Sequence, residues 1–206
     1  MIDKYLEKAV RIILKKYDEN LTIEDLEKIE ELNLNYYDIF EEKNIIKIEE
    51  LQNFKNLRRL SLAKFCLSKE DIRLLGTLNY LYSLNLNNCT IENEEDISEL
   101  SKLTSIELRN MKINSLSFCN NLKNLKKLSL RDSQIKYFSD IKKCIVLEYL
   151  DIEGIGNLNL DFLLYLDCLK LINVSRQQLT EYNLKILKEL EKRHEFSYKI
   201  EMKNIY

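Results

Sequence analysis

The sequence of 206 residues contains no proline, no tryptophan, only 3 glycines and a single histidine. Proline and glycine most often mark turns and flexible linkers, so the near absence of both favours one continuous body over several domains joined by linkers. A chain of this length with 45% hydrophobic residues can bury the core of one domain or of one repeat array. We therefore expect a single domain over residues 1–206.

Sequence motifs for catalysis and for metal binding are also missing. The chain has no glycine-rich phosphate loop, no H-E-x-x-H, no G-x-S-x-G, and no cysteine paired with a histidine at a catalytic spacing. Carboxylate pairs such as Glu94 and Glu95 are common where 32% of residues are charged, and there they are typical of a solvated face. The sequence predicts no enzyme activity, no catalytic residue, no metal and no other cofactor.

The cysteines and the N-terminus bear on the cellular compartment. The five cysteines are far apart and form no C-x-x-C pair, so we expect free thiols, buried or half-buried, in a reducing compartment. The N-terminal stretch lacks the apolar run of a signal peptide, and no segment approaches the roughly 20 apolar residues of a membrane span. The predicted location is cytoplasmic without a membrane partner, and the sequence leaves export without a leader open. The cysteines are Cys66, Cys89, Cys119, Cys144 and Cys168.

Charge of neither sign dominates the chain. Lys and Arg number 32 against 34 Asp and Glu, for a formal net charge of -2 at pH 7. Such a chain has no overall field that would gather polyanions or anionic lipid. Binding of nucleic acid would need a local basic patch, so nucleic acid is not the expected partner.

An apolar pattern recurs along most of the chain. In LYSLNLNNCTI, residues 81–91, apolar residues follow one another at steps of three, two, three and two, which fits neither a helix nor a simple strand. The last five of the seven copies start at a constant spacing, and the first two units are longer because they carry insertions. The pattern predicts about seven repeats over residues 29–179. The copies start at residues 29, 57, 81, 103, 125, 147 and 169.

The repeat unit resembles the leucine-rich repeat, whose consensus is L-x-x-L-x-L-x-x-N/C-x-L. The copy at 81–91 matches it fully, with Cys89 in the N/C position, and the 22-residue period is similar to the short-repeat class of internalins and of intracellular phosphatase-regulating repeat proteins. The resemblance implies an α/β leucine-rich repeat solenoid, with a curved parallel β-sheet on the concave side and short helices or 3-10 turns on the convex side.

The physical reading of the spacing agrees with this fold. In x-x-L-x-L the two leucines point the same way from a short strand, and stacked units align these strands into a parallel sheet over a shared interior. The ninth column departs from the family's Asn, so we expect no continuous polar ladder at the bends. This column reads Tyr37, Phe65, Cys89, Met111, Ser133, Ile155 and Gln177.

Both ends of such a stack expose an apolar face that needs a cap. Residues 1–28 predict a helical N-terminal cap, with a second helix starting at Thr22 and Asp25 in capping-box position. Residues 180–206 predict a C-terminal cap of one helix, starting at Thr180 and ending near His194, and one strand. The N-terminal apolar stripe comprises Ile2, Tyr5, Leu6, Ala9, Val10, Ile13, Leu14 and Tyr17. The C-terminal apolar positions are Leu184, Leu187, Leu190, Phe196, Tyr198, Ile200 and Met202.

The variable residues beside and between the paired leucines form three columns, which we expect to be a solvent-open concave surface. Arg109, Arg131 and Tyr149 are its expected anchors, because Arg and Tyr are typical hot-spot residues. The alternative is that opposite charges merely pair across strands and favour solubility. The predicted partner-binding residues are Arg59, Asn85, Asn87, Glu107, Arg109, Lys127, Arg131, Tyr149, Asp151 and Glu153.

These observations favour a protein-interaction module, an adaptor or scaffold that acts without a cofactor and is monomeric on its own. The resemblance also allows a second function, a regulatory subunit that modulates a bound enzyme such as a phosphatase. RNA binding through the central basic residues is less favoured, because Glu107, Asp151 and Glu153 are interleaved with them.

Overall fold

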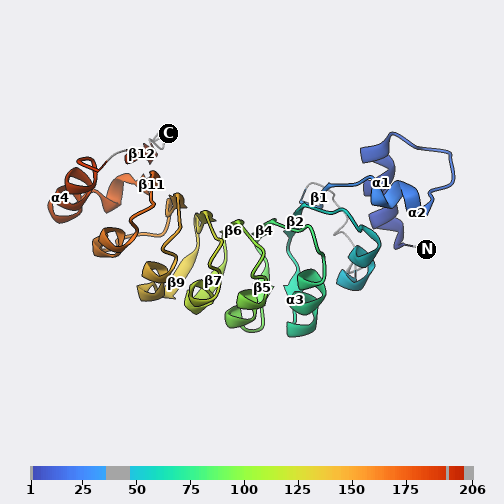
Figure 1. Ribbon diagram of the computed structural model, residues 1–206, viewed down its shortest axis with the longest axis horizontal. Helices are drawn as coiled ribbons and strands as arrows, with labels where there is room; N and C mark the ends of the chain where they lie inside the picture. Colours follow the sequence, from blue (N-terminus) through green and yellow to red (C-terminus); the bar gives the residue numbers. More distant parts are fainter. Residues whose placement is uncertain (1, 36–46, 194, 202–206) are drawn as a thin grey trace.

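The chain folds into an arc of stacked coils, and the computed structural model describes residues 2–35, 47–193 and 195–201. Figure 1 shows the strands of the large sheet along the inner, concave side of the arc and the helices along its outer, convex side. The N-terminal helices and the C-terminal helix lie at opposite ends.

The inner side is one parallel sheet of eight strands in the order β1-β2-β4-β6-β8-β10-β11-β12. Adjacent strands belong to successive coils, so each crossover passes around the convex side before the chain returns to the sheet. The strands are β1 Glu31–Asn33, β2 Arg59–Ala63, β4 Ser83–Asn87, β6 Ser105–Arg109, β8 Lys127–Ser129, β10 Tyr149–Asp151, β11 Leu171–Ser175 and β12 Ser197–Glu201.

The strand register confirms the predicted alignment of the repeats. The second apolar residue of each unit lies opposite its counterpart in the next strand, and none of these side chains is more than 1% exposed. Leucines pointing inward therefore form one continuous core across the coils. The aligned residues are Leu32, Leu60, Leu84, Ile106, Leu128, Leu150 and Ile172. Tyr37 and Ile39 of the first unit lie outside the described residues.

The convex side carries short helices, as the resemblance implies, and the described residues also form two small sheets that were not predicted. The second unit, which is longer than those that follow, forms a true α-helix there, α3 Lys69–Gly76, whose start is fixed by a capping box between Ser68 and Asp71. The 3-10 helices are η2 Ile48–Asn53, η3 Glu94–Glu99, η4 Ser117–Asn120, η5 Ser139–Lys143, η6 Asp161–Tyr165 and η7 Arg176–Gln178. The small sheets pair β3 Cys66–Leu67 with β5 Thr90–Ile91, and β7 Lys112–Ser115 with β9 Gln134–Tyr137.

Among the described residues, polar side chains of the ninth column make hydrogen bonds at the bends of Cys89 and Ser133. Ser133 Oγ donates to the Leu108 carbonyl at 2.8 Å and accepts from the backbone N–H of Met111 at 3.0 Å. Cys89 Sγ lies 3.5 Å from the Leu62 carbonyl of the preceding coil.

In the seventh unit, the side chain that hydrogen-bonds the backbone at the bend is Gln178 rather than the predicted Gln177. Gln178 is fully buried and donates to the Ile152 carbonyl at 3.2 Å, whereas Gln177 is exposed. The assignment of the column to Gln177 is wrong there, because the chain enters the 3-10 helix η7 at this bend and shifts the inward position by one residue.

The N-terminal helices are α1 Lys4–Leu14 and α2 Ile23–Glu27, and the predicted capping box of Thr22 and Asp25 is present. Leu6, Ala9 and Val10 are buried, as the stripe predicts, but Ile13 and Tyr17 are exposed. Tyr17 leaves the stripe because α1 ends at Leu14 and Lys15 turns into the left-handed conformation.

The C-terminal helix α4, Glu181–Leu190, starts at Thr180, whose hydroxyl accepts the Asn183 N–H at 3.2 Å. Leu187 and Leu190 are buried as predicted, and Leu184 is half-buried. The predicted strand is β12, which extends the sheet by pairing with β11. Within it Tyr198 packs on the core while Ile200 is exposed, and His194 and Met202 lie outside the described residues.

All five cysteines are free thiols. Cys89, Cys119 and Cys144 are buried, but Cys66 and Cys168 are exposed. The expectation of burial is wrong for these two because Cys66 points outward from β3 and Cys168 follows the end of η6 on the surface. Among the described residues, no helix is long and apolar enough to cross a lipid bilayer.

Candidate functional site

The concave face of the main sheet brings most of the predicted binding residues together. Seven of the ten come from three neighbouring strands, β6, β8 and β10, or from the residues that directly follow them. Their side chains alternate with the buried leucines, so the strand period of two places them on one face. This central group comprises Glu107, Arg109, Lys127, Arg131, Tyr149, Asp151 and Glu153.

Arg131 is held in place by Glu153. Arg131 Nη1 lies 2.7 Å from Glu153 Oε2, and Nη2 donates to Oε1 at 2.9 Å, which is the bidentate geometry of a strong guanidinium–carboxylate pair. Glu153 is only 4% exposed, whereas the Arg131 side chain keeps 29% of its surface open. The guanidinium is thus fixed before any partner arrives, which lowers the entropy lost on binding.

A second group of polar contacts surrounds Glu107. Its Oε2 accepts the Asn85 amide N–H at 3.0 Å and lies 3.1 Å from Arg109 Nε. Because the Asn85 amide turns its nitrogen toward the carboxylate, its Oδ1 points away, and this buried oxygen has no hydrogen-bond partner in the part of the chain that the structure describes. This oxygen is shielded from solvent, so the arrangement leaves one acceptor of the site without a partner among the described residues.

Tyr149 stands beside these groups on β10. Its hydroxyl oxygen accepts the Asn173 amide N–H at 2.8 Å, which leaves its own proton to donate. Partial burial, with the negative charge of Asp151 next in importance, raises the pKa of Tyr149, so the phenol stays neutral near pH 7. Asn173 was missed as a candidate because it carries neither charge nor ring, although it belongs to the same variable columns.

Two of the predicted binding residues and one neighbour are buried, although the sequence predicts that this surface is open to solvent. Asp151, Glu153 and Ser129 are 1%, 4% and 3% exposed. Asp151 turns back to the sheet, accepting the Glu153 N–H at 3.1 Å and the Ser129 hydroxyl at 3.4 Å, and Arg131 covers the Glu153 carboxylate. The expectation of exposure is wrong here, because both carboxylates bind donors of neighbouring residues on the closely spaced strands. These contacts replace their contacts with water and keep them buried.

The other predicted residues lie away from this group. Arg59 on β2 pairs with Glu31, with 3.0 Å between Nε and Oε2, and also contacts the Tyr82 hydroxyl at 3.3 Å. Both members of that pair are about half exposed, so its contribution to stability is about 0–1 kcal/mol. Asn87 is at the end of β4, next to the bends. Lys127, in contrast, is exposed and makes no ion pair with a described residue.

The bends after the strands share a backbone feature that sequence reasoning missed. The residue in the eighth column has a positive φ in five successive coils, and Asn88, Asn110 and Asp132 have φ of 52°, 53° and 57°. Asn, Asp and Gly tolerate this left-handed region best, so the recurrence of these residues in one column was the available signal. An open hollow beside these bends is lined by Asn87, Asn88, Arg109, Asn110, Arg131 and Asp132.

Solved structures of known proteins share the fold of this chain. No protein-family profile matches the chain, and no curated protein sequence is similar to it. Among solved structures, an internalin C2 from Listeria monocytogenes is 25% identical with a TM-score of 0.64, over 84% of this chain and 74% of that chain. An internalin F from the same species is 20% identical with a TM-score of 0.67, over 97% and 64%.

A leucine-rich repeat protein from Leptospira interrogans is 19% identical with a TM-score of 0.52, over 74% of this chain and 46% of that chain. The chain thus spans less than two thirds of the length of the internalin F and of the Leptospira protein. The repeat register, the continuous parallel sheet and this likeness to solved structures together show that the chain folds as a leucine-rich repeat solenoid.

Proposed function

We propose that this leucine-rich repeat protein is a protein-interaction module, an adaptor that binds its partner through the concave face of the main sheet and catalyses no reaction itself. The observation that carries the proposal is the central group on β6, β8 and β10, where the Arg131 guanidinium is fixed by Glu153 beside the half-buried ring of Tyr149. The cytoplasmic location and the monomeric state inferred from sequence stay predictions.

The chemistry of the face indicates the kind of partner. The three columns carry four basic and four acidic residues, so they match a partner with both signs of charge rather than a polyanion. Lys127 is exposed and makes no ion pair with a described residue, so it is free to meet a carboxylate of the partner. Tyr149 is the sole aromatic residue of the columns, so we expect few hot spots and moderate affinity.

A charge reversal at Lys127 tests this proposal most cleanly. Lys127→Glu places a negative charge on the exposed face, whereas Arg131→Glu would also strand the buried Glu153 carboxylate and risk unfolding. We expect affinity purification from the native cell to recover a partner with the unmodified protein and to lose it with Lys127→Glu. Lys112→Glu, exposed on β7 outside the main sheet, is the matched control and should retain that partner.

The outcome that contradicts the proposal is a set of bound proteins that is the same for Lys127→Glu, for Tyr149→Ala and for the unmodified chain. An adaptor and a regulatory subunit are then separated by the activity of the captured partner. If the partner is an enzyme such as a phosphatase, and adding this protein changes its rate, the regulatory function applies; an adaptor leaves the rate unchanged.

RNA binding through the central basic residues is the less favoured alternative. Arg109 and Arg131 are both engaged by carboxylates, which leaves Lys127 as the free cation of the central group among the described residues. Phosphate contacts would make the affinity for RNA fall steeply with salt concentration. Binding of a single-stranded RNA that weakens steeply between low and physiological salt would favour this alternative over the adaptor.

A further inference from the structure

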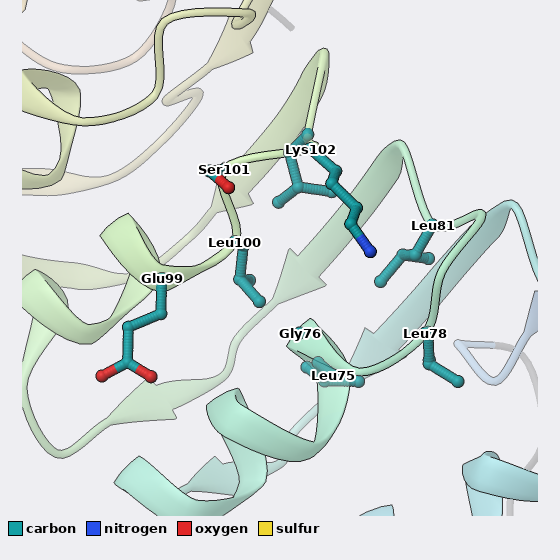
Figure 2. A pocket seen from close by; sticks show the side chains of 9 residues that line it. Leu75, Gly76, Leu78, Leu81, Glu99, Leu100, Ser101 and Lys102 are labelled. Carbon is teal, nitrogen blue, oxygen red and sulfur yellow. The ribbon is translucent and has the colours of Figure 1, made fainter.

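Two hollows of the solenoid differ in whether a ligand can enter them. The hollow at the junction of the second and third repeats, shown in Figure 2, is lined by five leucines that are 1–5% exposed and belong to the core. The hollow beside the bends of the concave face is open to solvent and measures about 580 Å³. All side chains that line this second hollow are polar, so it suits a polar group of a partner. We call it the bend hollow, and its lining residues are Asn87, Asn88, Arg109, Asn110, Arg131 and Asp132.

Arg109 lines the bend hollow with hydrogen-bond donors that are not used. Its Nε lies 3.1 Å from Glu107 Oε2, but this is an ion contact only, because Nε has no hydrogen-bond partner in the part of the chain that the structure describes. Its terminal nitrogens, Nη1 and Nη2, also donate to no described residue, and the side chain is 41% exposed. Arg131 differs, because both of its Nη atoms contact the Glu153 carboxylate. Arg109 therefore keeps a pair of terminal nitrogens for a ligand.

A chain of side-chain amides provides a second donor. Asn110 Nδ2 donates to Asn88 Oδ1, and Asn88 Nδ2 donates to Asn87 Oδ1 at 3.1 Å. The bends hold these amides in a row, because the Asn88 N–H donates to the Arg109 carbonyl and the Asn110 N–H to the Arg131 carbonyl, each at 3.0 Å. Since the Asn87 oxygen is the last acceptor of the chain, Asn87 Nδ2 is left with two N–H groups and no acceptor among the described residues.

The two sets of donors lie side by side. Asn87 and Arg109 are opposite each other in the register of β4 and β6, so their side chains are on the same face of the sheet. Both side chains line the bend hollow. Adjacent strands are only about 4.8 Å apart, which lets a group with two oxygen atoms reach a donor on each strand. A carboxylate has this shape.

The acidic residues near the bend hollow limit what can bind there. Asp132 leans toward the sixth unit, because a Cβ built on Gly154 would lie 2.1 Å from Asp132 Oδ1, and its carboxylate is thus turned away from the third and fourth units. Glu153 is 4% exposed and is covered by Arg131, whereas the Glu107 side chain is 36% exposed. A single carboxylate can meet the donors and stay clear of these groups, but a chain of phosphates would be repelled by them.

We propose that the bend hollow binds an acidic side chain of the protein partner, whose carboxylate accepts hydrogen bonds from Arg109 Nη1 and Nη2 and from Asn87 Nδ2. The guanidinium fork matches a carboxylate, and such charge-assisted bonds are roughly twice as strong as neutral ones. This proposal rests on the proposed function, because it names the group of the partner that the concave face holds at the ends of β4 and β6. RNA is a poorer match, since the lining has no aromatic residue on which a base could stack.

The test uses the full chain and two blocked tripeptides, acetyl-Gly-Glu-Gly-amide and acetyl-Gly-Gln-Gly-amide. Nuclear magnetic resonance of the isotope-labelled protein follows the side-chain N–H signals of Arg109 and Asn87. We expect both signals to shift saturably with the glutamate peptide and not with the glutamine peptide, because only the first offers a charged acceptor. Added salt should weaken the binding, because the exposed charges are screened.

Variants separate the fork of Arg109 from its charge. Arg109→Gln should weaken binding of the glutamate peptide roughly tenfold or more, because hydrogen bonds to a charged group are lost. Arg109→Lys keeps the charge but not the fork, so it should also bind more weakly. Asn87→Ala should weaken binding by a smaller factor. Arg58→Gln is the matched control, because Arg58 also pairs with a glutamate, Glu30 at 3.3 Å, and lies outside the three concave columns; it should bind as the unmodified chain does.

Three results would overturn the proposal. In the first, neither signal shifts with the glutamate peptide, or the glutamine peptide shifts both equally. In the second, Arg109→Gln binds the glutamate peptide as tightly as the unmodified chain. In the third, an oligouridylate displaces the glutamate peptide at equal or lower concentration, which would favour RNA as the ligand of the bend hollow.

A failure of this proposal is distinguishable from a failure of the proposed function. If Lys127→Glu loses the partner but Arg109→Gln retains it, the concave face binds the partner and the carboxylate site is wrong. If the glutamate peptide shifts the Arg109 signal while Lys127→Glu and Tyr149→Ala retain every bound protein, the carboxylate site is supported and the adaptor proposal fails.

Discussion

At the scale of single residues, the backbone is tightly constrained at the bends that follow the strands. The second to sixth units each place a residue with positive φ in the eighth column. In the sixth unit this residue is Gly154, with φ of 77°. A Cβ built on Gly154 would lie 2.1 Å from Asp132 Oδ1 and 3.0 Å from the Asp132 Cα, so the neighbouring coil leaves no room for a side chain there.

Gly154→Ala should therefore destabilise the protein by about 1–3 kcal/mol, the range for a residue held in an unfavourable backbone conformation, with the steric clash placing it at the upper end. Gly156→Ala is the matched control. Its φ is 91°, but nothing lies within 4 Å of the added Cβ, so only the backbone strain applies. Urea denaturation followed by circular dichroism measures both variants, and an equal loss of stability in the two would contradict the argument.

Sequence predicted which residues would share the concave face but not how each side chain would lie on it. The period of two and the alignment of units are enough to place Arg109, Arg131 and Tyr149 together. Whether Asp151 faces water or turns to the Glu153 N–H depends on the rotamers of several neighbours at once, and a repeat pattern has no information on these.

At the scale of secondary-structure elements, the ends of the stack depend on polar contacts as much as on leucines. The helix α2 has only five residues, too few to be stable alone, and Asp25 ties it to its surroundings. The Asp25 carboxylate contacts Lys28 Nζ at 3.0 Å, Lys16 Nζ at 3.1 Å and the Thr22 N–H at 3.1 Å. The contact with Lys16 joins α2 to the segment that follows α1.

These contacts predict a dependence of stability on pH. Hydrogen bonds from Lys28 first, then from the Thr22 N–H and from Lys16, lower the pKa of Asp25 well below its usual value. Because the pKa in the unfolded chain is higher, about 3.9, the unfolded state takes up protons first as the pH falls. The stabilisation from Asp25 is therefore fully present above about pH 5 and is lost progressively in more acidic solution.

We expect Asp25→Asn to be less stable than the unmodified protein at neutral pH, with the difference shrinking as the pH is lowered toward 3. Asp18→Asn removes an exposed carboxylate of the same segment and controls for net charge. Guanidinium denaturation at a series of pH values measures the difference. A gap between Asp25→Asn and the unmodified chain that is independent of pH would show that the carboxylate does not act through its charge.

The elements of the convex side were less predictable than the strands. The sequence pattern implies short helices or turns there, but it does not distinguish an α-helix from a 3-10 helix. The longer second unit forms the α-helix α3, whereas the third unit forms the 3-10 helix η3. The small sheets β3–β5 and β7–β9 were not predicted from the sequence. Their strands are too short to show a recognisable alternation of apolar and polar residues.

At the scale of the whole molecule, the solenoid is a stack in which each coil is stable only against its neighbours. The buried side chains form one cluster that extends from Leu6 in α1 to Phe196 before β12. A defect in a central coil therefore separates the two halves of the core from each other. The same arrangement leaves the alternate residues of every strand on the concave face, so the architecture and the proposed docking surface share one physical basis.

The most direct test compares two neighbouring residues of β8. Leu128 is 0% exposed and points into the core, whereas Lys127 is exposed on the concave face. Leu128→Asp buries an unpaired carboxylate and removes apolar packing, so it should lower the urea midpoint sharply or abolish folding. Lys127→Asp should stay within about 0.5 kcal/mol of the unmodified chain. Equal urea midpoints for the two variants would contradict both the register and the orientation of the concave face.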